Sequence, residues 1–293
     1  MSQFDKYYFS TGCGSTAYGS TPAWHQNFAS MAATIASELA PQRVLDAGCA
    51  MGLLVAALRA RGIEADGIDI SEYAISQVPA EASAYCRLGS ITEPFNQHYD
   101  LIISIEVLEH MSADQSELAI ANFCAYSDSV LFSSTPLDFK EVTHINVRNP
   151  EAWSAVFARH GFFRDVDFDA SFITPWALRY VRRSAPAARL IRDYERRFWE
   201  LWKERCDLRA LAEEQRHIMA SDAETLTELH RRDAEREQDV LAMQSYIQRL
   251  EETLQAKNAH IAQLETLLGR IQQGHVLRII QGLESRLKKN YRP

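Results

Sequence analysis

Residues 44–52, VLDAGCAMG, decide how the first half of this chain is expected to fold. A short apolar run ends in Asp46, and Gly48 and Gly52 follow it. The first glycine allows a sharp turn, the second allows a following helix to pack closely, and the N–H groups at that helix start can bind an anionic group. About 20 residues later, Asp69 lies at the end of a second expected strand, EADGIDI, where a carboxylate can accept both hydroxyls of a ribose. This turn and acid predict a nucleoside ligand.

Strand and helix patterns alternate through the rest of this half. Strands are expected in RVLDA, EADGIDI, SAYCRL, YDLIISI, SVLFSST, FRDVDF and WALRYVRR, and helices in MGLLVAALRARG, SEYAISQV, SADQSELAIANFCAYS and NPEAWSAVFARHG. Ser71 is expected to cap the second of these helices. The alternation predicts an α/β fold with a doubly wound, seven-stranded, mostly parallel sheet that binds ligands at the carboxyl ends of its strands.

The second half of the chain lacks helix breakers. No glycine occurs between Gly161 and Gly269, and no proline between Ala187 and Arg292, which predicts an extended helix. Apolar residues recur every seven positions in two series, Ile191, Phe198, Ala212, Met219, Leu226, Val240, Ile247, Leu254, Ile261 and Leu268, and Tyr194, Leu201, Leu208, Leu229, Met243, Leu250, Leu264 and Ile271. This repeat predicts a left-handed coiled coil and hence a homo-oligomer, with dimer and trimer both open. The alternative is one amphipathic helix packed on the globular part, but about 80 residues would rise about 120 Å.

The chain ends in the basic, amphipathic stretch HVLRIIQGLESRLKKNYRP. Its apolar face and its basic residues are Val276, Ile280, Leu283 and Leu287, and Arg278, Arg286, Lys288, Lys289 and Arg292. Such a stretch suits an anionic membrane surface or a partner protein, and it also suits a frayed coiled-coil end.

Composition narrows the partners and the compartment. The net charge of −8 and the pI near 5.6 argue against nucleic acid as a partner. The five cysteines, Cys13, Cys49, Cys86, Cys124 and Cys206, are scattered, so neither a disulfide framework nor a zinc cluster is expected. No signal peptide and no apolar run of about 20 residues is seen, so we expect a cytoplasmic protein, with peripheral contact on the inner membrane face as an option.

Four motifs in order resemble those of class I S-adenosylmethionine-dependent methyltransferases: VLDAGCAMG, GIDIS, YDLIISIEVLEH and VLFSSTP. The resemblance covers about residues 20–185 and implies a cofactor site formed by Asp46, Gly48, Cys49, Gly52, Asp69, Ile70, Ser90, Ile91 and Glu106. Two positions depart from the family pattern: Ser90 replaces a frequent Asp beside the adenine, and Ala50 replaces a common glycine. A nicotinamide cofactor would need G-x-G-x-x-G, which DAGCAMG does not supply.

The expected organisation follows from these motifs. Residues 1–40 form a lid and helix, 41–185 the methyltransferase core, 187–272 the coiled coil and 275–293 the basic tail. The aromatic and glycine-rich residues 7–24 are the part expected to cover the cofactor.

The stretch IEVLEH, residues 105–110, places Glu106, Glu109 and His110 on one face of a helical turn. His144, in THINV after the next strand, is expected at the same sheet edge. Two carboxylates and imidazole suit Mg²⁺ or Mn²⁺. The four residues resemble the metal ligands of small-RNA 3′-terminal 2′-O-methyltransferases and of ubiquinone-pathway catechol O-methyltransferases. His110, His144 and Glu106 are the candidate catalytic groups. The alternative is a metal-free EVLEH whose acid bonds the cofactor or caps a helix.

A methyltransferase joined to a long coiled coil and a basic tail resembles bacterial O-antigen chain-terminating methyltransferases. That resemblance implies methylation of a sugar hydroxyl in a cell-surface polysaccharide, a glycan acceptor and a glycosyltransferase or polymerase partner. The alternatives are a small-molecule or RNA-terminal O-methyltransferase, and a non-catalytic scaffold with a methyltransferase fold. The acidic composition favours sugar over RNA.

Overall fold

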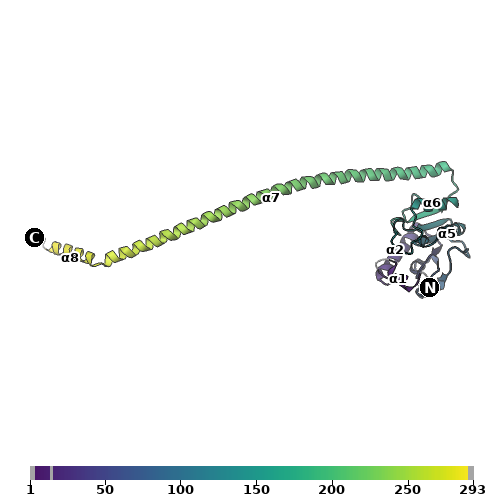
Figure 1. Cartoon of the computed structure of the whole chain (residues 1–293), viewed down its shortest axis with the longest axis horizontal. Helices are drawn as coiled ribbons and strands as arrows, with labels where there is room; N and C mark the ends of the chain where they lie inside the picture. The colour runs from purple at the N-terminus through teal and green to yellow at the C-terminus, as the bar shows by residue number, and fades with distance from the viewer. Residues whose placement is uncertain (1–3, 14–15, 290–293) are drawn as a thin grey trace. The chain divides into compact units, whose positions relative to one another are not determined.

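The structure is a computed structural model that describes residues 4–13 and 16–289. Parts of the expected lid, residues 1–3 and 14–15, and Arg292 of the basic tail lie outside the described residues. The chain divides into two units, Met1–Trp202 and Lys203–Pro293, and the first contains the sheet (Figure 1).

Seven strands form one sheet in the order β3-β2-β1-β4-β5-β7-β6, which confirms the predicted α/β methyltransferase fold. The parallel strands are β1 (Arg43–Ala47), β2 (Glu64–Asp69), β3 (Cys86–Leu88), β4 (Leu101–Ile105) and β5 (Ser129–Ser133). β7 (Leu178–Arg182) runs antiparallel to β5 and to β6 (Phe162–Arg164). The strand order reverses beside β1, and in sheets of this kind ligands bind at the carboxyl ends of the strands at that point, here β1 and β4.

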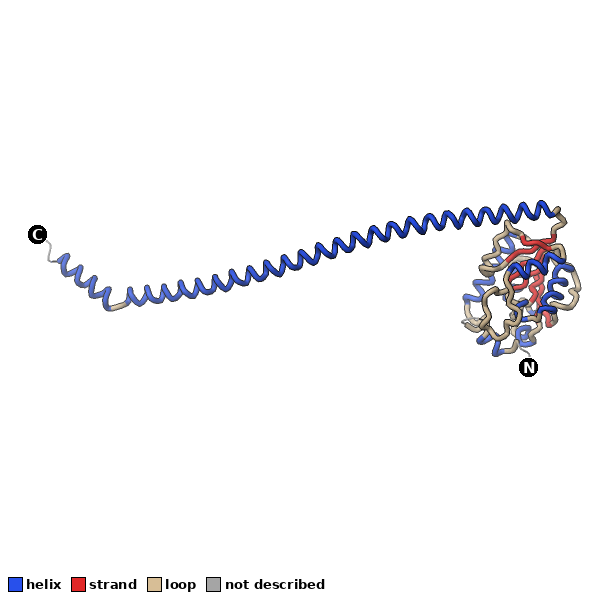
Figure 2. The backbone as a smooth tube through the Cα atoms, turned by 45° about the horizontal axis from the view of Figure 1, so that its top comes forward, coloured by secondary structure: helices blue, strands red, loops and turns tan. Residues whose placement is uncertain are grey.

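Helices cover the sheet on both faces, as Figure 2 shows for the red strands among blue helices. They are α1 (Lys6–Thr11), α2 (Pro22–Glu38), α3 (Leu53–Arg59), α4 (Glu72–Ser76), α5 (Ala113–Tyr126) and α6 (Pro150–Arg159), with 3₁₀ turns η1 (Ser83–Tyr85) and η2 (Leu108–His110). Neighbouring strand residues enter different cores: Val44 packs with α2 and α3, and Leu45 packs with α5 and α6. This two-sided burial explains why the strands read as nearly unbroken apolar runs.

Two predicted strands are reduced to three residues each, β3 and β6. Residues 83–85 form η1, because Ala82 and Tyr85 continue a series of tight turns that begins at Pro79. After β6 the Asp165 N–H still donates to the Arg179 carbonyl at 2.8 Å, and residues 166–168 leave the sheet. The Asp165 carboxylate pairs with Arg179 and Arg183 at 3.0 and 3.2 Å. The predicted cap of α4 is confirmed, since Ser71 Oγ accepts the Ala74 N–H at 3.0 Å.

The predicted long helix is confirmed as α7 (Ala187–Gln273), which has 87 residues and is followed by α8 (His275–Lys289). Two ion pairs hold its first turns within the first unit: Arg183 with Asp193 at 3.4 Å, and Arg196 with Asp167 at 2.8 Å. The large apolar side chains of the two seven-residue series are 40% to 68% exposed in the single chain. Self-association through them stays a prediction.

Candidate functional site

The turn after β1 is built from backbone hydrogen bonds to β2. The N–H groups of Gly48 and Cys49 donate to the carbonyl of Ile68 at 2.8 and 3.1 Å. Gly48 has φ of +91°, and a Cβ there would lie 2.3 Å from a methyl carbon of Val107. Only glycine therefore fits this position without a shift of its neighbours.

Two acids lie at the ends of β1 and β2: Asp46 is buried and Asp69 is partly buried. Asp69 accepts the N–H of Ala50 and of Ser71, both at 2.8 Å, so it ties the turn to the start of α4. Each carboxylate oxygen has a second lone pair, which leaves acceptor capacity for a ligand hydroxyl. Burial, and then the charge of Asp69, raises the pKa of Asp46 to about 7. A cationic ligand at these strand ends would favour the ionised form of Asp46.

Three further cofactor residues expected from the sequence, Ile70, Ser90 and Ile91, lie just after β2 and β3. Ile70 is 61% exposed, whereas Ile91 is buried. The hydroxyl of Ser90 is 2.7 Å from that of Thr92, and the Gly89 N–H donates to the Asp69 carbonyl at 2.9 Å. These residues follow the parallel strands β2 and β3, beside Asp69.

Glu106 has a strained backbone at the end of β4, with φ of +53°. Its N–H donates to the Ser133 carbonyl at 2.9 Å, and its Oε1 accepts from the indole N–H of Trp176 at 2.9 Å and from the Ser133 hydroxyl. Residues that are 27 and 70 positions away thus fix a non-glycine residue in the left-handed region, where strain is typical of functional sites.

Three of the four metal candidates converge. The ligand atoms of Glu109, His110 and His144 all lie within 4.8 Å of one another, and Glu106 is not among them. Glu109 and His110 belong to η2, and His144 lies in the loop after β5. The Asn146 N–H donates to the Glu109 carbonyl at 2.9 Å, which holds this loop against η2.

The hydrogen bonds around the two histidines assign their tautomers. Thr143 Oγ1 donates to Glu141 Oε1 at 2.6 Å, so it accepts from His110 Nδ1 at 2.9 Å. Nδ1 of His144 donates to the carbonyl of Asp138 at 2.9 Å. Both rings therefore keep an Nε2 lone pair, the arrangement of ligating histidines whose other nitrogen is held by a neighbouring group.

Glu109 completes the donor set. Its Oε1 accepts the Thr135 N–H at 3.3 Å, while its buried Oε2 has no hydrogen-bond partner among the residues that the structure describes. Burial, and then the Glu106 carboxylate, raises the pKa of Glu109 to about 8. Burial, and then His144, lowers the pKa of His110 to about 4. Without an ion, Glu109 and His110 are therefore both mainly uncharged at pH 7.

The amino-terminal residues cover the cluster. The carbonyl of Phe4 accepts the Ser71 hydroxyl at 2.6 Å, and the Tyr8 hydroxyl lies 3.3 Å from His110 Nε2. The Phe4 ring packs edge-on to His110 at 5.5 Å between ring centroids. Aromatic composition pointed to this segment, but nothing in the pattern singled out Tyr8.

Sequence reasoning also missed Thr143 and Trp176. Thr143 follows the same strand as His144, so a search of the loop beside a candidate ligand would have found it. Trp176 bonds Glu106 across 70 positions, and no local pattern indicates such a contact.

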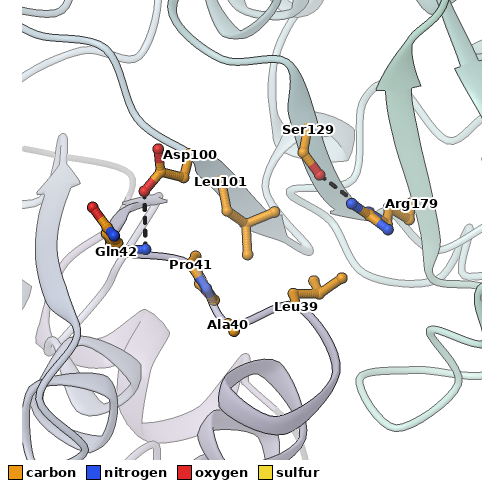
Figure 3. A pocket seen from close by; sticks show the side chains of 8 residues that line it. All are labelled: Leu39, Ala40, Pro41, Gln42, Asp100, Leu101, Ser129 and Arg179. Atoms are coloured by element: carbon orange, nitrogen blue, oxygen red, sulfur yellow. Dashed lines mark hydrogen bonds between the residues drawn. The ribbon is translucent and has the colours of Figure 1, made fainter.

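An open groove of about 400 Å³ lies away from these groups (Figure 3). Its lining residues are Leu39, Ala40, Pro41, Gln42, Asp100, Leu101, Ser129 and Arg179. Leu101 and Ser129 are the first residues of β4 and β5, so the groove is at the amino ends of the strands. Ligands of this fold bind at the opposite ends, and we do not assign the groove a role.

Comparison with known proteins gives consistent matches for the first unit. A family model described as a methyltransferase domain matches residues 23–169, half of the chain. The ubiquinone biosynthesis O-methyltransferase of Methylococcus capsulatus is 29% identical over 111 residues, which cover 34% of this chain and 45% of the relative. The protein of that name from an Azoarcus species is 32% identical over 114 residues, covering 35% and 48%. The chain spans about half the length of these curated relatives.

Among solved structures, the magnesium protoporphyrin IX methyltransferase of Synechocystis PCC 6803 with bound SAH is similar to 54% of this chain. The match covers 83% of that protein, with 20% sequence identity and a TM-score of 0.44.

Proposed function

The chain belongs to the methyltransferase-domain family, and from that premise we propose that it transfers a methyl group from S-adenosylmethionine to a hydroxyl oxygen of its acceptor. The observation that carries the proposal is the pair of carboxylates at the ends of the neighbouring strands β1 and β2. Asp46 is buried and Asp69 is partly buried, and a Cβ at Gly48 in the turn after β1 would overlap Val107. Asp69 suits the ribose hydroxyls, and Asp46 suits the cationic methionine end of the donor.

The transfer needs few groups. The acceptor oxygen bonds to the methyl carbon, the carbon–sulfur bond breaks with its electron pair going to sulfur, and the hydroxyl proton leaves to a base. Nε2 of His110 or His144 is available as that base because both carry a lone pair. Alignment of donor and acceptor supplies most of the acceleration in such a displacement.

Glu109, His110 and His144 also fit a divalent metal ion. The unpartnered Oε2 of Glu109 and the two Nε2 atoms give one oxygen and two nitrogen donors. Two imidazoles favour Mn²⁺ over Mg²⁺. When bound, the ion would polarise an acceptor hydroxyl and orient a vicinal diol. Glu106, the fourth sequence candidate, instead holds Ser133 and Trp176 with its Oε1.

For the acceptor we propose a sugar hydroxyl of a cell-surface polysaccharide, with a glycosyltransferase or polymerase as partner. The long helix α7 and the exposed apolar residues of its seven-residue repeat support this proposal. Methyl transfer does not require a long oligomerising helix, whereas positioning the enzyme at a growing polymer would use one. The net charge of −8 argues against RNA. We further propose that α7 forms a homo-oligomer and that the protein is cytoplasmic, with α8 on the inner membrane face.

A second acceptor class is favoured by one observation. Four apolar side chains in the loop that carries His144 are 63% to 91% exposed: Leu137, Phe139, Val142 and Ile145. They would suit a small hydroxylated acceptor with an apolar chain. The similar Azoarcus and Methylococcus proteins are ubiquinone biosynthesis O-methyltransferases, which is consistent with this option.

One experiment separates the acceptor classes. Purified protein is incubated with methyl-labelled S-adenosylmethionine and either glycans with a terminal vicinal diol or apolar catechols, with Mn²⁺ or with EDTA. Label in the glycan supports the first proposal, and label in the catechol alone supports the second. Equal turnover in EDTA-treated, metal-free protein would show that the reaction does not need a metal ion. If calorimetry detects no binding of S-adenosylmethionine, the alternative of a non-catalytic scaffold would be favoured.

A further inference from the structure

Tyr8 occupies the nitrogen that the proposed chemistry needs. His110 donates its Nδ1 proton to Thr143, so its Nε2 accepts the Tyr8 O–H, and the two atoms lie 3.3 Å apart. An acceptor hydroxyl that gives its proton to His110, or an ion bound by it, would need the same lone pair. The tyrosine hydroxyl thus takes the place of a ligand.

The local structure holds Tyr8 in this position. Asp5 caps α1 and accepts the N–H groups of Tyr7 and Tyr8 at 2.8 and 3.2 Å. A Cβ at Gly12 would lie 3.0 Å from the Tyr8 ring, so the chain turns closely around that ring. The Phe4 ring meets the Tyr8 ring edge-on at 5.1 Å.

The same segment is also fixed outside the Tyr8 contact. Ser71, which caps α4 beside Asp69, donates its hydroxyl to the Phe4 carbonyl at 2.6 Å. Phe9 is 6% exposed and packs against Tyr73. The segment therefore joins the cofactor side of the site to the His110 side.

We propose that Tyr8 is a gating residue that latches residues 4–13 over the site. The closed latch and an occupied His110 Nε2 exclude each other, so ion or acceptor must displace the Tyr8 hydroxyl before methyl transfer. This inference rests on the proposed function for the identity of the competing ligand. The contact between the two side chains does not depend on it.

Tyr7 provides a matched control. It precedes Tyr8 on the same helix, is 75% exposed, and its hydroxyl makes no hydrogen bond within the part of the chain that the structure describes. Tyr8→Phe and Tyr7→Phe each remove one hydroxyl and keep the ring. Far-UV circular dichroism checks that both variants fold.

The first measurement is the affinity for Mn²⁺ by calorimetry on the full chain. Loss of the competing hydrogen bond should tighten binding roughly 2- to 10-fold in Tyr8→Phe, and Tyr7→Phe should bind as the natural protein does. Weaker binding in Tyr8→Phe would make the tyrosine a ligand, and unchanged binding would mean that it does not compete. Either result overturns the proposal.

The second measurement is amide hydrogen exchange in α1 without added ion. Exchange at Phe9 and Gly12 should be faster in Tyr8→Phe and unchanged in Tyr7→Phe. Saturating Mn²⁺ should speed the same amides in the natural protein. If no form binds Mn²⁺, the metal part of the proposed function fails. The comparison of amide exchange between Tyr8→Phe and the natural protein still tests whether Tyr8 holds residues 4–13 in place. Equal exchange in Tyr8→Phe and the natural protein would overturn the proposal.

Discussion

Gly48 shows how one missing side chain shapes the turn after β1. A Cβ at this position would lie 2.3 Å from Val107, whereas one at Gly62 would have nothing within 4 Å, although φ is also positive there at +80°. Substitutions at Gly48 and Gly62 therefore distinguish the effect of backbone strain, which both positions share, from the effect of a steric clash, which only Gly48 has.

We predict that Gly62→Ala lowers the free energy of unfolding by roughly 1 kcal/mol, through strain alone. Gly48→Ala should lower it by roughly 2 to 4 kcal/mol, because the overlap with Val107 adds to the strain. Urea denaturation measures both. Gly48→Ala should also lose donor binding in calorimetry, and equal stability of the two variants would contradict the steric argument.

Glu109 predicts a pH dependence. Its pKa is about 8 in the folded protein and near 4.5 when unfolded, so the folded state binds the proton more tightly. Its contribution to stability is full below about pH 4.5 and is lost as pH rises to about 8. Asp46 acts in the same direction up to about pH 7, and His110 acts oppositely between about pH 4 and 6.5.

Glu109→Gln should therefore gain stability relative to the natural protein between pH 5 and pH 9, by roughly 2 to 4 kcal/mol. Denaturant unfolding of metal-free protein at the two pH values measures the difference. The exposed Glu81→Gln is the control for the loss of one carboxyl group at the surface. A parallel response of both variants would show that Glu109 is ionised when folded.

The sequence predicted those site residues that lie at the ends of strands. Asp46, Asp69 and Glu109 follow neighbouring parallel strands, and the rule that such ends share one edge places them without a structure. It could not find that Tyr8 contacts His110 across 102 positions, or that Trp176 bonds Glu106 across 70. Such contacts have no periodic signature in the chain.

At the scale of elements, every predicted strand has a counterpart in the sheet. The central strands β1, β4 and β5 are buried almost throughout, whereas β3, β6 and β7 have exposed or partly exposed positions. The errors are local. Residues 83–85 and 166–168 were expected in strands, but tight turns after Pro79 and the pairing of Asp165 with two arginines remove them. Local polar contacts of this kind outweigh a short β-type pattern.

Substitutions in α7 can test whether its seven-residue repeat forms a coiled coil. We predict that Ile247→Glu with Leu250→Glu, both at repeat positions, dissociates the oligomer and lowers helicity, because buried charges face each other along the seam. Gln248→Glu with Gln255→Glu adds the same charge off the seam and should have little effect. Light scattering and circular dichroism at micromolar protein measure both, and a monomeric natural protein would refute the coiled coil.

For the whole molecule, an oligomer would bring several copies of α8 to one surface. The segment His275–Lys289 carries four Arg and Lys residues and one Glu, within a chain whose net charge is −8. Its Ile279, Ile280, Leu283 and Leu287 side chains are 53% to 66% exposed. A charge pattern of this kind suits an anionic bilayer. No helix among the described residues combines the length and apolarity that crossing a bilayer requires.

We predict that the protein co-sediments with vesicles containing anionic lipid and not with neutral ones. Multivalency should make the binding of the oligomer at least about tenfold stronger than that of the Ile247→Glu, Leu250→Glu monomer. Equal binding of the two forms would mean that α8 acts singly. Equal binding to neutral vesicles would mean that its basic residues contribute nothing.

The partly buried thiol of Cys13 belongs to the last residue of the segment 4–13 that Tyr8 is proposed to hold closed, and its Sγ lies 3.9 Å from the Tyr8 carbonyl oxygen. Burial raises its pKa to about 11, so it is a slow nucleophile while the segment is closed. The rate at which iodoacetamide alkylates Cys13, measured by mass spectrometry, therefore reports how often the segment opens. The alkylation rate of Cys206 on α7 serves as the internal reference.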